Sequence, residues 1–154
     1  MFNVLFYKSD ENGKLHVSDF NLISLKNGDY KFYENKSIIS FYNDLSSLAD
    51  GGYMFYRCTA LTAFGSDLSS LSNGNHMFEY CGSLTTFKSD LSSVTNGNYM
   101  FRGCSNLTTF TSDSSGSPMN LNSLTNGDCM FYGCNKLSQF TSDLSSLTDG
   151  TSMF

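Results

Sequence analysis

The sequence predicts an α/β repeat solenoid, and three observations support this fold class. Phenylalanine recurs every 23 residues, at Phe41, Phe64, Phe87 and Phe110, and Phe140 follows after a gap of 30. Cysteines, methionines and Asn-Gly or Asp-Gly pairs recur with the same period. No unit contains an apolar helix of several turns or a long alternating strand that could close a core by itself. Each unit must therefore stack on its neighbours.

One complete unit spans residues 81–103, and its apolar positions, mostly three or four residues apart, are expected to be buried. Residues 84–87 contain β-favouring threonine and are the predicted strand. Strands of successive units should pair in parallel, about 4.8 Å apart. Residues 100–104 have helical spacing and predict a short helical turn opposite the sheet. The Asn-Gly pairs are interpreted as bends in which glycine supplies a positive φ.

These columns resemble the BspA-like class of leucine-rich repeat. The shared pattern is C-x-x-L-x-x-F-x(3)-L-x-x-L-x(5)-M-F-x-x-C, and it covers roughly residues 22–154 in about six turns. Leu91 and Val94 lie two residues earlier than in the family pattern, and the usual proline is absent. The resemblance implies a leucine-rich-repeat-like stack with a parallel β-sheet on one face. It also implies a surface protein of a microbe that recognises a host or partner molecule.

The period breaks at three places. Residues 1–20 contain two β-rich runs around Asn12-Gly13 and predict a capping β-hairpin, with the solenoid occupying residues 21–154. Residues 114–120 are an insertion, expected to form a surface loop. The sequence stops in mid-unit at Met153 and Phe154. We expect either that this end packs against another chain or that the sequence is part of a longer array.

Composition excludes several classes of function. The net charge is -5 and only nine residues are Lys or Arg, so no nucleic-acid partner is expected. No apolar run approaches the length of a membrane span, and the first residues lack the pattern of a signal peptide. Phosphate-binding loops, nucleophile elbows and His-Glu metal motifs are absent from the sequence. We therefore expect neither an enzyme nor a cofactor.

Two columns of titratable residues allow alternative interpretations. The recurring cysteines favour reduced core residues, with disulfides between neighbouring turns as the alternative and metal binding disfavoured by their spacing; they are Cys58, Cys81, Cys104 and Cys134. The recurring aspartates favour turns capped by a carboxylate, with a calcium ladder as the alternative; they are Asp44, Asp67, Asp90, Asp113 and Asp143.

Two further columns are candidate ligand-binding residues. A threonine column on the predicted strands comprises Thr62, Thr85, Thr86, Thr108 and Thr109, and an aromatic column comprises Tyr53, His76 and Tyr99. Hydroxyl groups and aromatic rings on a solenoid surface suit a protein or glycan ligand. The first hypothesis is therefore an adhesion-type recognition module. The second is a structural or assembly component of a cell surface or virus particle that self-associates through the C-terminal end. A surface-exposed location is expected, and a cytoplasmic one stays open.

Overall fold

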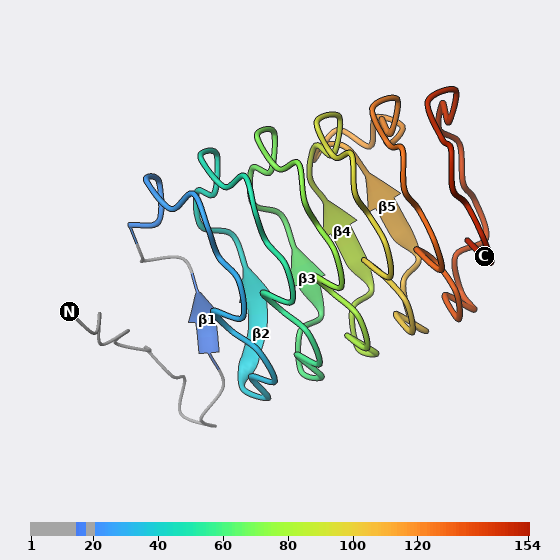
Figure 1. The fold of residues 1–154 in the computed structure, drawn as a ribbon. Coiled ribbons are helices and arrows are strands. Elements are labelled where there is room, and N and C mark those ends of the chain that lie inside the picture. The colour runs from blue at the N-terminus through green and yellow to red at the C-terminus, as the bar shows by residue number, and fades with distance from the viewer. Residues whose placement is uncertain (1–14, 18–20) are drawn as a thin grey trace.

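The computed structural model describes residues 15–17 and 21–154. Five short strands form one parallel sheet in chain order: β1 (Leu15–Val17), β2 (Ile38–Phe41), β3 (Ala63–Phe64), β4 (Thr86–Lys88) and β5 (Thr109–Thr111). Figure 1 shows the turns stacked side by side from the blue end to the red end, with the sheet as one wall. Partners in neighbouring strands are one period apart, as in Thr86 and Thr109. The predicted solenoid and its parallel sheet are confirmed.

Strand β1 lies inside the segment expected to form a hairpin cap. It pairs in parallel with β2, from Leu15 opposite Ile38 to Val17 opposite Phe41. Residues 15–17 therefore make the first rung of the solenoid sheet. The other residues of the expected hairpin lie outside the described residues, so the cap stays a prediction.

A second ladder of parallel bridges runs along the Asn-Gly and Asp-Gly positions. It joins Asn27, Asp50, Asn73, Asn96, Asn126 and Asp149 in order. Their side chains also connect neighbouring turns, because the Asn73 amide donates to Asp50 over 2.9 Å and the Asn96 amide donates to Asn73 over 3.1 Å. This column holds the turns together opposite the sheet.

The glycines of these pairs have a different role from the one expected. None of them has a positive φ. A Cβ atom at Gly74 would instead lie 2.8 Å from Sδ of Met100 in the next turn, and one at Gly51 would lie 2.9 Å from Sδ of Met77. The methionine of the following turn thus packs closely against these two glycines, and an added Cβ would have to displace its side chain.

The expected short helical turns are not confirmed, because no residue that the structure describes lies in a helix. Residues 51–58 form overlapping turns, in which Met54 N–H donates to Gly51 O and Cys58 N–H to Phe55 O. Tyr53 and Arg57 have φ values of 56° and 54°. These left-handed residues interrupt a helix and turn alternate N–H groups toward the next turn of the solenoid.

The core is built from columns of identical residues. Phe41, Phe64 and Phe87 stack at centroid separations of 5.8 and 5.4 Å, and their edges meet a second phenylalanine column. Phe55, Phe78 and Phe101 form that second column, at 5.3 and 5.4 Å. Alternating stacked and edge-on contacts are favourable arrangements for aromatic pairs. Each turn thus completes the core of its neighbour.

Candidate functional site

The threonines predicted to bind a ligand form a column of hydroxyl groups that bond to their own scaffold. Thr62 Oγ1 donates to Ile39 O over 3.0 Å, Thr85 Oγ1 to Thr62 O over 3.1 Å, and Thr108 Oγ1 to Thr85 O over 3.1 Å. Each hydroxyl links one turn to the turn before it. These donors are therefore already used in stabilising the stack.

Thr86 and Thr109 lie one position further along, in β4 and β5. They are opposite each other in the sheet and both are half-buried. The structure therefore separates the predicted threonines into a hydroxyl ladder before the strands and a pair within them. The predicted aromatic residues lie on a different edge of the solenoid.

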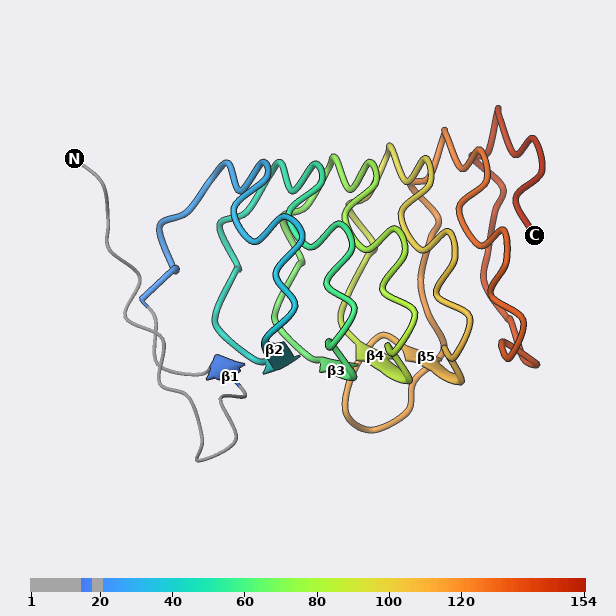
Figure 2. The same cartoon turned by 90° about the horizontal axis from the view of Figure 1, so that it is seen from below.

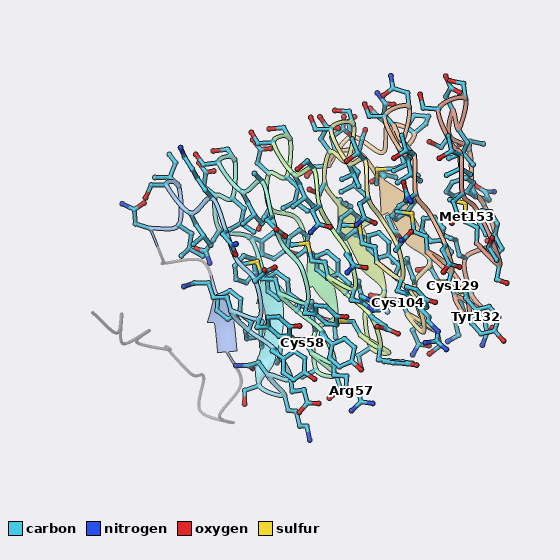
Figure 3. All side chains as sticks on the ribbon, viewed as in Figure 1. Arg57, Cys58, Cys104, Cys129, Tyr132 and Met153 are labelled. Atoms are coloured by element: carbon cyan, nitrogen blue, oxygen red, sulfur yellow. The ribbon has the colours of Figure 1, made fainter. Side chains whose placement is uncertain are left out.

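The aromatic column belongs to a surface that we call the turn face, made by residues 30–34, 53–57, 76–80, 99–103 and 129–133. Arg57 and Tyr132 mark this surface along the lower edge of the molecule in Figure 3. Four rings stack nearly parallel along it, with Tyr30–Tyr53 at 4.8 Å, Tyr53–His76 at 4.4 Å and His76–Tyr99 at 4.7 Å. The structure thus brings the predicted Tyr53, His76 and Tyr99 together and adds Tyr30 to them.

Backbone conformation explains why these side chains project from the turns. Tyr30, Tyr53, His76 and Tyr99 all have φ between 56° and 59°. Bulky residues seldom occupy this left-handed region. Hydrogen bonds between turns hold them there, as where Tyr53 N–H donates to Asn75 O over 3.0 Å and His76 N–H donates to Asn98 O over 2.9 Å.

Tyr80 is the centre of a second cluster on the turn face. The guanidinium carbon of Arg57 lies 5.6 Å from the centroid of the Tyr80 ring, and that of Arg102 lies 5.5 Å from it. Arg102 also lies 5.5 Å from Tyr99 and 5.8 Å from Tyr132. At such distances guanidinium groups are attracted to aromatic rings. The two arginines and Tyr80 therefore hold one another in place.

Glycine makes room for this cluster. Gly103 has a φ of 73°, and a Cβ atom there would lie 2.7 Å from Cδ1 of Tyr80. The equivalent position one turn earlier is Tyr80 itself. A side chain at Gly103 would push the Tyr80 ring away from its present position.

A buried carboxylate fixes one side of the cluster. Glu79 is only 3% exposed. Its carboxylate pairs with His76 Nδ1 and, over 3.1 Å, with Nη1 of Arg102. The hydrogen bond to Glu79 raises the pKa of Arg102. A buried carboxylate needs such partners, and in return it orients the arginine.

Arg57 is held more loosely. Its Nη1 lies 3.3 Å from Glu34, and the side chains of both residues are about half exposed, at 52% and 42%. An exposed ion pair of this kind contributes little to stability. The Arg57 guanidinium is therefore available to a partner at small cost.

Sequence reasoning missed most of the turn face. Tyr33 and Tyr56 stack at 5.0 Å, but the next members of their column are Glu79 and Arg102, so the column does not repeat in residue type. The signal in the sequence was the shared period of 23 residues rather than a shared residue. Arg57 and Tyr80 are likewise related only by the period of 23 residues and not by residue type.

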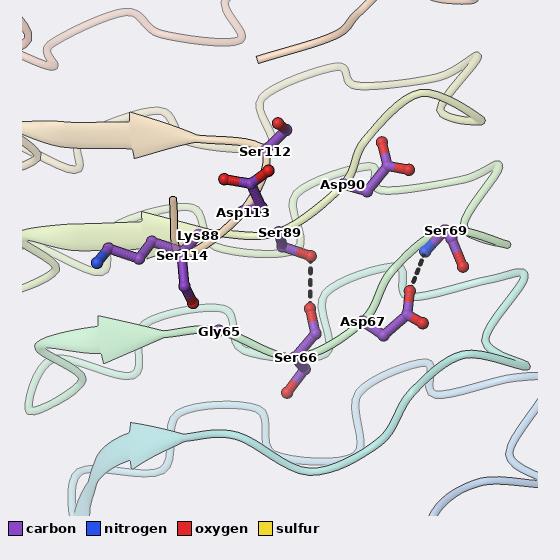
Figure 4. A pocket seen from close by; sticks show the side chains of 10 residues that line it. All are labelled: Gly65, Ser66, Asp67, Ser69, Lys88, Ser89, Asp90, Ser112, Asp113 and Ser114. Atoms are coloured by element: carbon purple, nitrogen blue, oxygen red, sulfur yellow. Dashed lines mark hydrogen bonds between the residues drawn. The ribbon is translucent and has the colours of Figure 1, made fainter. Parts of the chain in front are cut away.

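The aspartates of the predicted column cap bends that follow the strands. Asp44, Asp67 and Asp90 each accept the backbone N–H two residues later over 2.8 Å, and Asp113 and Asp143 do the same. Figure 4 shows Asp67 with its bond to Ser69 in a shallow polar hollow. This geometry is that of the carboxylate-capped turn. Within residues 15–17 and 21–154, no three His, Cys, Asp or Glu residues are placed to hold a metal ion.

The cysteine column packs in the core without disulfides, with Cys58, Cys81 and Cys104 buried and Cys134 partly buried. Cys58 Sγ donates to Phe32 O over 3.1 Å, and Cys81 Sγ donates to Phe55 O over 3.0 Å. Cys104 and Cys134 repeat this contact with the earlier turn. Burial raises the pKa of Cys58 and of Cys134 to about 12. These thiols act as small core residues, as the favoured interpretation of the sequence expects.

Comparison with known protein families identifies the repeat type of the chain. The BspA type leucine-rich repeat region matches in six copies over residues 26–154. Comparison with curated proteins and with solved structures finds no significant match. Among the described residues, no helix is long and apolar enough to cross a membrane. The family match covers most of the chain and agrees with the parallel sheet and its 23-residue register. The protein belongs to the BspA type leucine-rich repeat family.

Proposed function

We propose that this chain is a non-enzymatic recognition module that binds a protein ligand through its turn face. Leucine-rich repeats generally mediate protein interactions, and BspA type proteins are often surface-associated. The observation that carries the proposal is the Tyr80 ring held between Arg57 and Arg102. A surface location on a microbial cell or virus particle is part of the same proposal.

The chemistry of the turn face is that of an interaction hot spot. Tyrosine and arginine dominate such spots because each gives a large contact area with directional polar groups. Here the rings are already stacked and Arg102 is already oriented by Glu79, so binding orders few side chains. Tyr80 and Tyr132 are 36% and 52% exposed, which leaves ring edges and hydroxyl groups open to a partner.

A display library of random peptides tests the proposal, because unbiased peptides gather at hot spots. We expect peptides enriched on the full chain to bind at least tenfold more weakly to an Arg57→Ala/Arg102→Ala variant, a loss of about 1.4 kcal/mol. Thr95→Ala, an exposed change outside the turn face, is the matched control and should bind normally. Enriched peptides that bind the two variants equally well would refute the turn face as the binding surface.

A glycan ligand is the alternative within the same function. A glycan array with the wild-type chain tests it, with Thr85→Lys and Thr108→Lys as variants of the hydroxyl ladder. Loss of a glycan signal in these variants would favour the threonine column. A protein ligand is preferred because the threonine hydroxyls bond within the scaffold, whereas Tyr80 and Tyr132 of the turn face are exposed.

Assembly is a second candidate function, favoured by one observation. The Phe154 ring stacks on Phe131 at 5.6 Å yet is 63% exposed, whereas Met153 is buried. A second copy could cover Phe154. Light scattering after size-exclusion chromatography tests this: a dimer that Phe154→Ser converts to monomer supports assembly, and a monomeric wild type speaks against it.

A further inference from the structure

The sheet ends one turn before the solenoid does. The last turn of the solenoid, turn six, stacks on the turn before it, turn five. They meet along the ladder of Asn-Gly and Asp-Gly positions, where Thr148 N–H donates to Thr125 O over 2.9 Å and Gly127 N–H donates to Asp149 O over 2.7 Å. On the sheet side, however, no backbone hydrogen bond joins β5 to residues 138–141 within the part of the chain that the structure describes. A sixth strand is therefore missing although its turn is in place.

The insertion at residues 114–120 accounts for the missing strand. Pro118 forms an antiparallel bridge with Thr111, and Ser112 N–H donates to Ser117 O over 3.0 Å. The Asp113 carboxylate holds this loop by accepting bonds from Ser115 and from Ser117 N–H. Figure 2 shows the orange loop projecting beyond the sheet next to β5. The loop thus pairs with one end of the outer edge of β5, where a sixth strand would otherwise pair.

A hollow of about 410 Å³ remains between β5, the loop and residues 139–141. Its volume is within the range of ligand pockets. None of the residues lining it is charged. Phe110 and Phe140 are only partly buried there, whereas Phe64 and Phe87 of the same column are fully buried. The ring centroids of Phe110 and Phe140 are 6.3 Å apart, a wider separation than the 5.6 Å between Phe87 and Phe110.

The outer edge of β5 lines this hollow, and only its end is paired with the loop. Thr109 N–H donates to Thr85 O and Thr111 O accepts from Ser89 N–H, so both residues face β4. Because alternate residues of a parallel strand bond to opposite neighbours, Phe110 N–H is directed into the hollow. Phe110 C=O instead faces Met119 N–H across the bridge between Thr111 and Pro118. Thr85 O accepts two backbone bonds, from Thr108 N–H and Thr109 N–H. The equivalent Thr108 O accepts none from the backbone of residues 21–154.

We propose that this hollow binds an extended, uncharged peptide segment of a partner protein, which adds as a strand to the open edge of β5. Addition of a strand to an exposed edge is a recurrent mode of peptide recognition. The peptide backbone would bond to Phe110 N–H and to Thr108 O. Its apolar side chain would cover the rings of Phe110 and Phe140. This site lies on the sheet and is independent of the turn face.

Amide hydrogen exchange of the isotope-labelled full chain tests the open edge. The Phe110 amide should exchange roughly a hundredfold faster than the Phe87 amide, which occupies the same position in a strand paired on both sides. Equal protection at Phe110 and Phe87 would overturn the proposal, because it would mean that the edge is already satisfied.

A synthetic peptide with blocked ends that copies residues 106–112 is the probe for binding, since this uncharged sequence already forms a strand in the same sheet. Its addition should shift the amide resonances of Phe110, Gln139 and Thr141 and slow exchange at Phe110 at least tenfold. Absence of these shifts in excess peptide, or shifts confined to the turn face, would contradict the proposal.

Deletion of residues 114–120 provides the decisive variant, because it returns Phe110 and Phe140 to the 23-residue period. We expect the shortened chain to form a sixth strand, to protect the Phe110 amide and to lose the peptide. Tyr80→Ala on the turn face is the control and should bind the peptide like the wild type. Undiminished binding to the deletion variant would refute the hollow as the site, and the wild-type exchange and titration decide the question if that variant does not fold.

Discussion

At the scale of single residues, the glycines at positions 51 and 74 are favoured by packing rather than by backbone conformation. Sequence reasoning identified these positions but assigned them a positive φ, because Asn-Gly is the usual signal of a tight turn. The left-handed residues are instead tyrosine and histidine two positions later, at Tyr53 and His76. The role of the glycine is visible only with the neighbouring turn in place, since the side chain that packs against Gly74 is that of Met100.

Gly74→Ala should therefore destabilise the protein. The new Cβ would lie 2.8 Å from Sδ of the buried Met100, and overpacking of this kind costs about 1–3 kcal/mol. Gly82→Ala is the matched control, because the nearest atom to its Cβ, Oγ of Ser105, is 3.9 Å away. Urea unfolding measures both variants. Equal stability of the two would show that the methionine does not require glycine.

The cysteines should differ in reactivity with a thiol-specific alkylating reagent at mildly alkaline pH. Cys81 and Cys104 are fully buried, and burial raises their pKa well above its usual value, so the reactive thiolate is scarce. Cys129 is only half-buried on the turn face. Mass spectrometry should find Cys129 modified first in the native state, with Cys81 and Cys104 modified only in denaturant. Early modification of Cys81 would contradict the core packing.

At the scale of elements, the strands were predictable and the turns were not. The strand predicted at residues 84–87 is observed as Thr86–Lys88, because threonine and phenylalanine mark it locally. Residues 100–104 have helical spacing but form turns, because hydrogen bonds to the next turn replace those within a helix. The helix propensity of the residues within one unit gives no information about these hydrogen bonds between units.

The aspartate-capped bends make stability sensitive to acid. The side-chain hydrogen bond with Ser46 lowers the pKa of Asp44, and bonds from Ser115 and Ser117 lower the pKa of Asp113. A carboxyl group whose pKa is lower in the folded state stabilises the protein at neutral pH and loses that effect as pH falls below its unfolded value of 3.8.

The free energy of unfolding should therefore decrease between about pH 5 and about pH 2. Asp44→Asn/Asp113→Asn keeps the acceptor oxygens without a titrating proton, so its pH profile should be flatter. Urea unfolding across this range measures both proteins. A double variant with the wild-type pH dependence would exclude these two carboxylates as its source.

At the scale of the whole molecule, the period of the sequence was sufficient to predict the solenoid, whereas the candidate turn face was predicted only in part. Tyr53, His76 and Tyr99 share a column of similar residues and were found. Arg57 and Tyr80 lie in columns whose residue type changes from turn to turn, so only the stacked structure brings them together. The missing sixth strand likewise depends on where the inserted loop folds.

Turn six should open before the turns in the middle of the stack. Leu144 and Leu147 are partly exposed, whereas the equivalent Leu91 and Val94 are fully buried. In a repeat protein, local opening follows the contacts of each turn with its neighbours. The Thr148 amide should therefore exchange at least roughly tenfold faster than the Thr95 amide. Equal exchange rates would indicate a single cooperative unit.

The glycine–methionine contact between turns also bears on how such a chain can change in length during evolution. Gly51 contacts Met77 as Gly74 contacts Met100. Each of these turns therefore presents a glycine surface that fits the methionine of the turn that follows it. A recombination event that duplicates or removes one whole period would rejoin compatible surfaces wherever it occurred. An event of any other length would misalign glycine and methionine in all later turns, unless the extra residues were expelled as a loop, as residues 114–120 are.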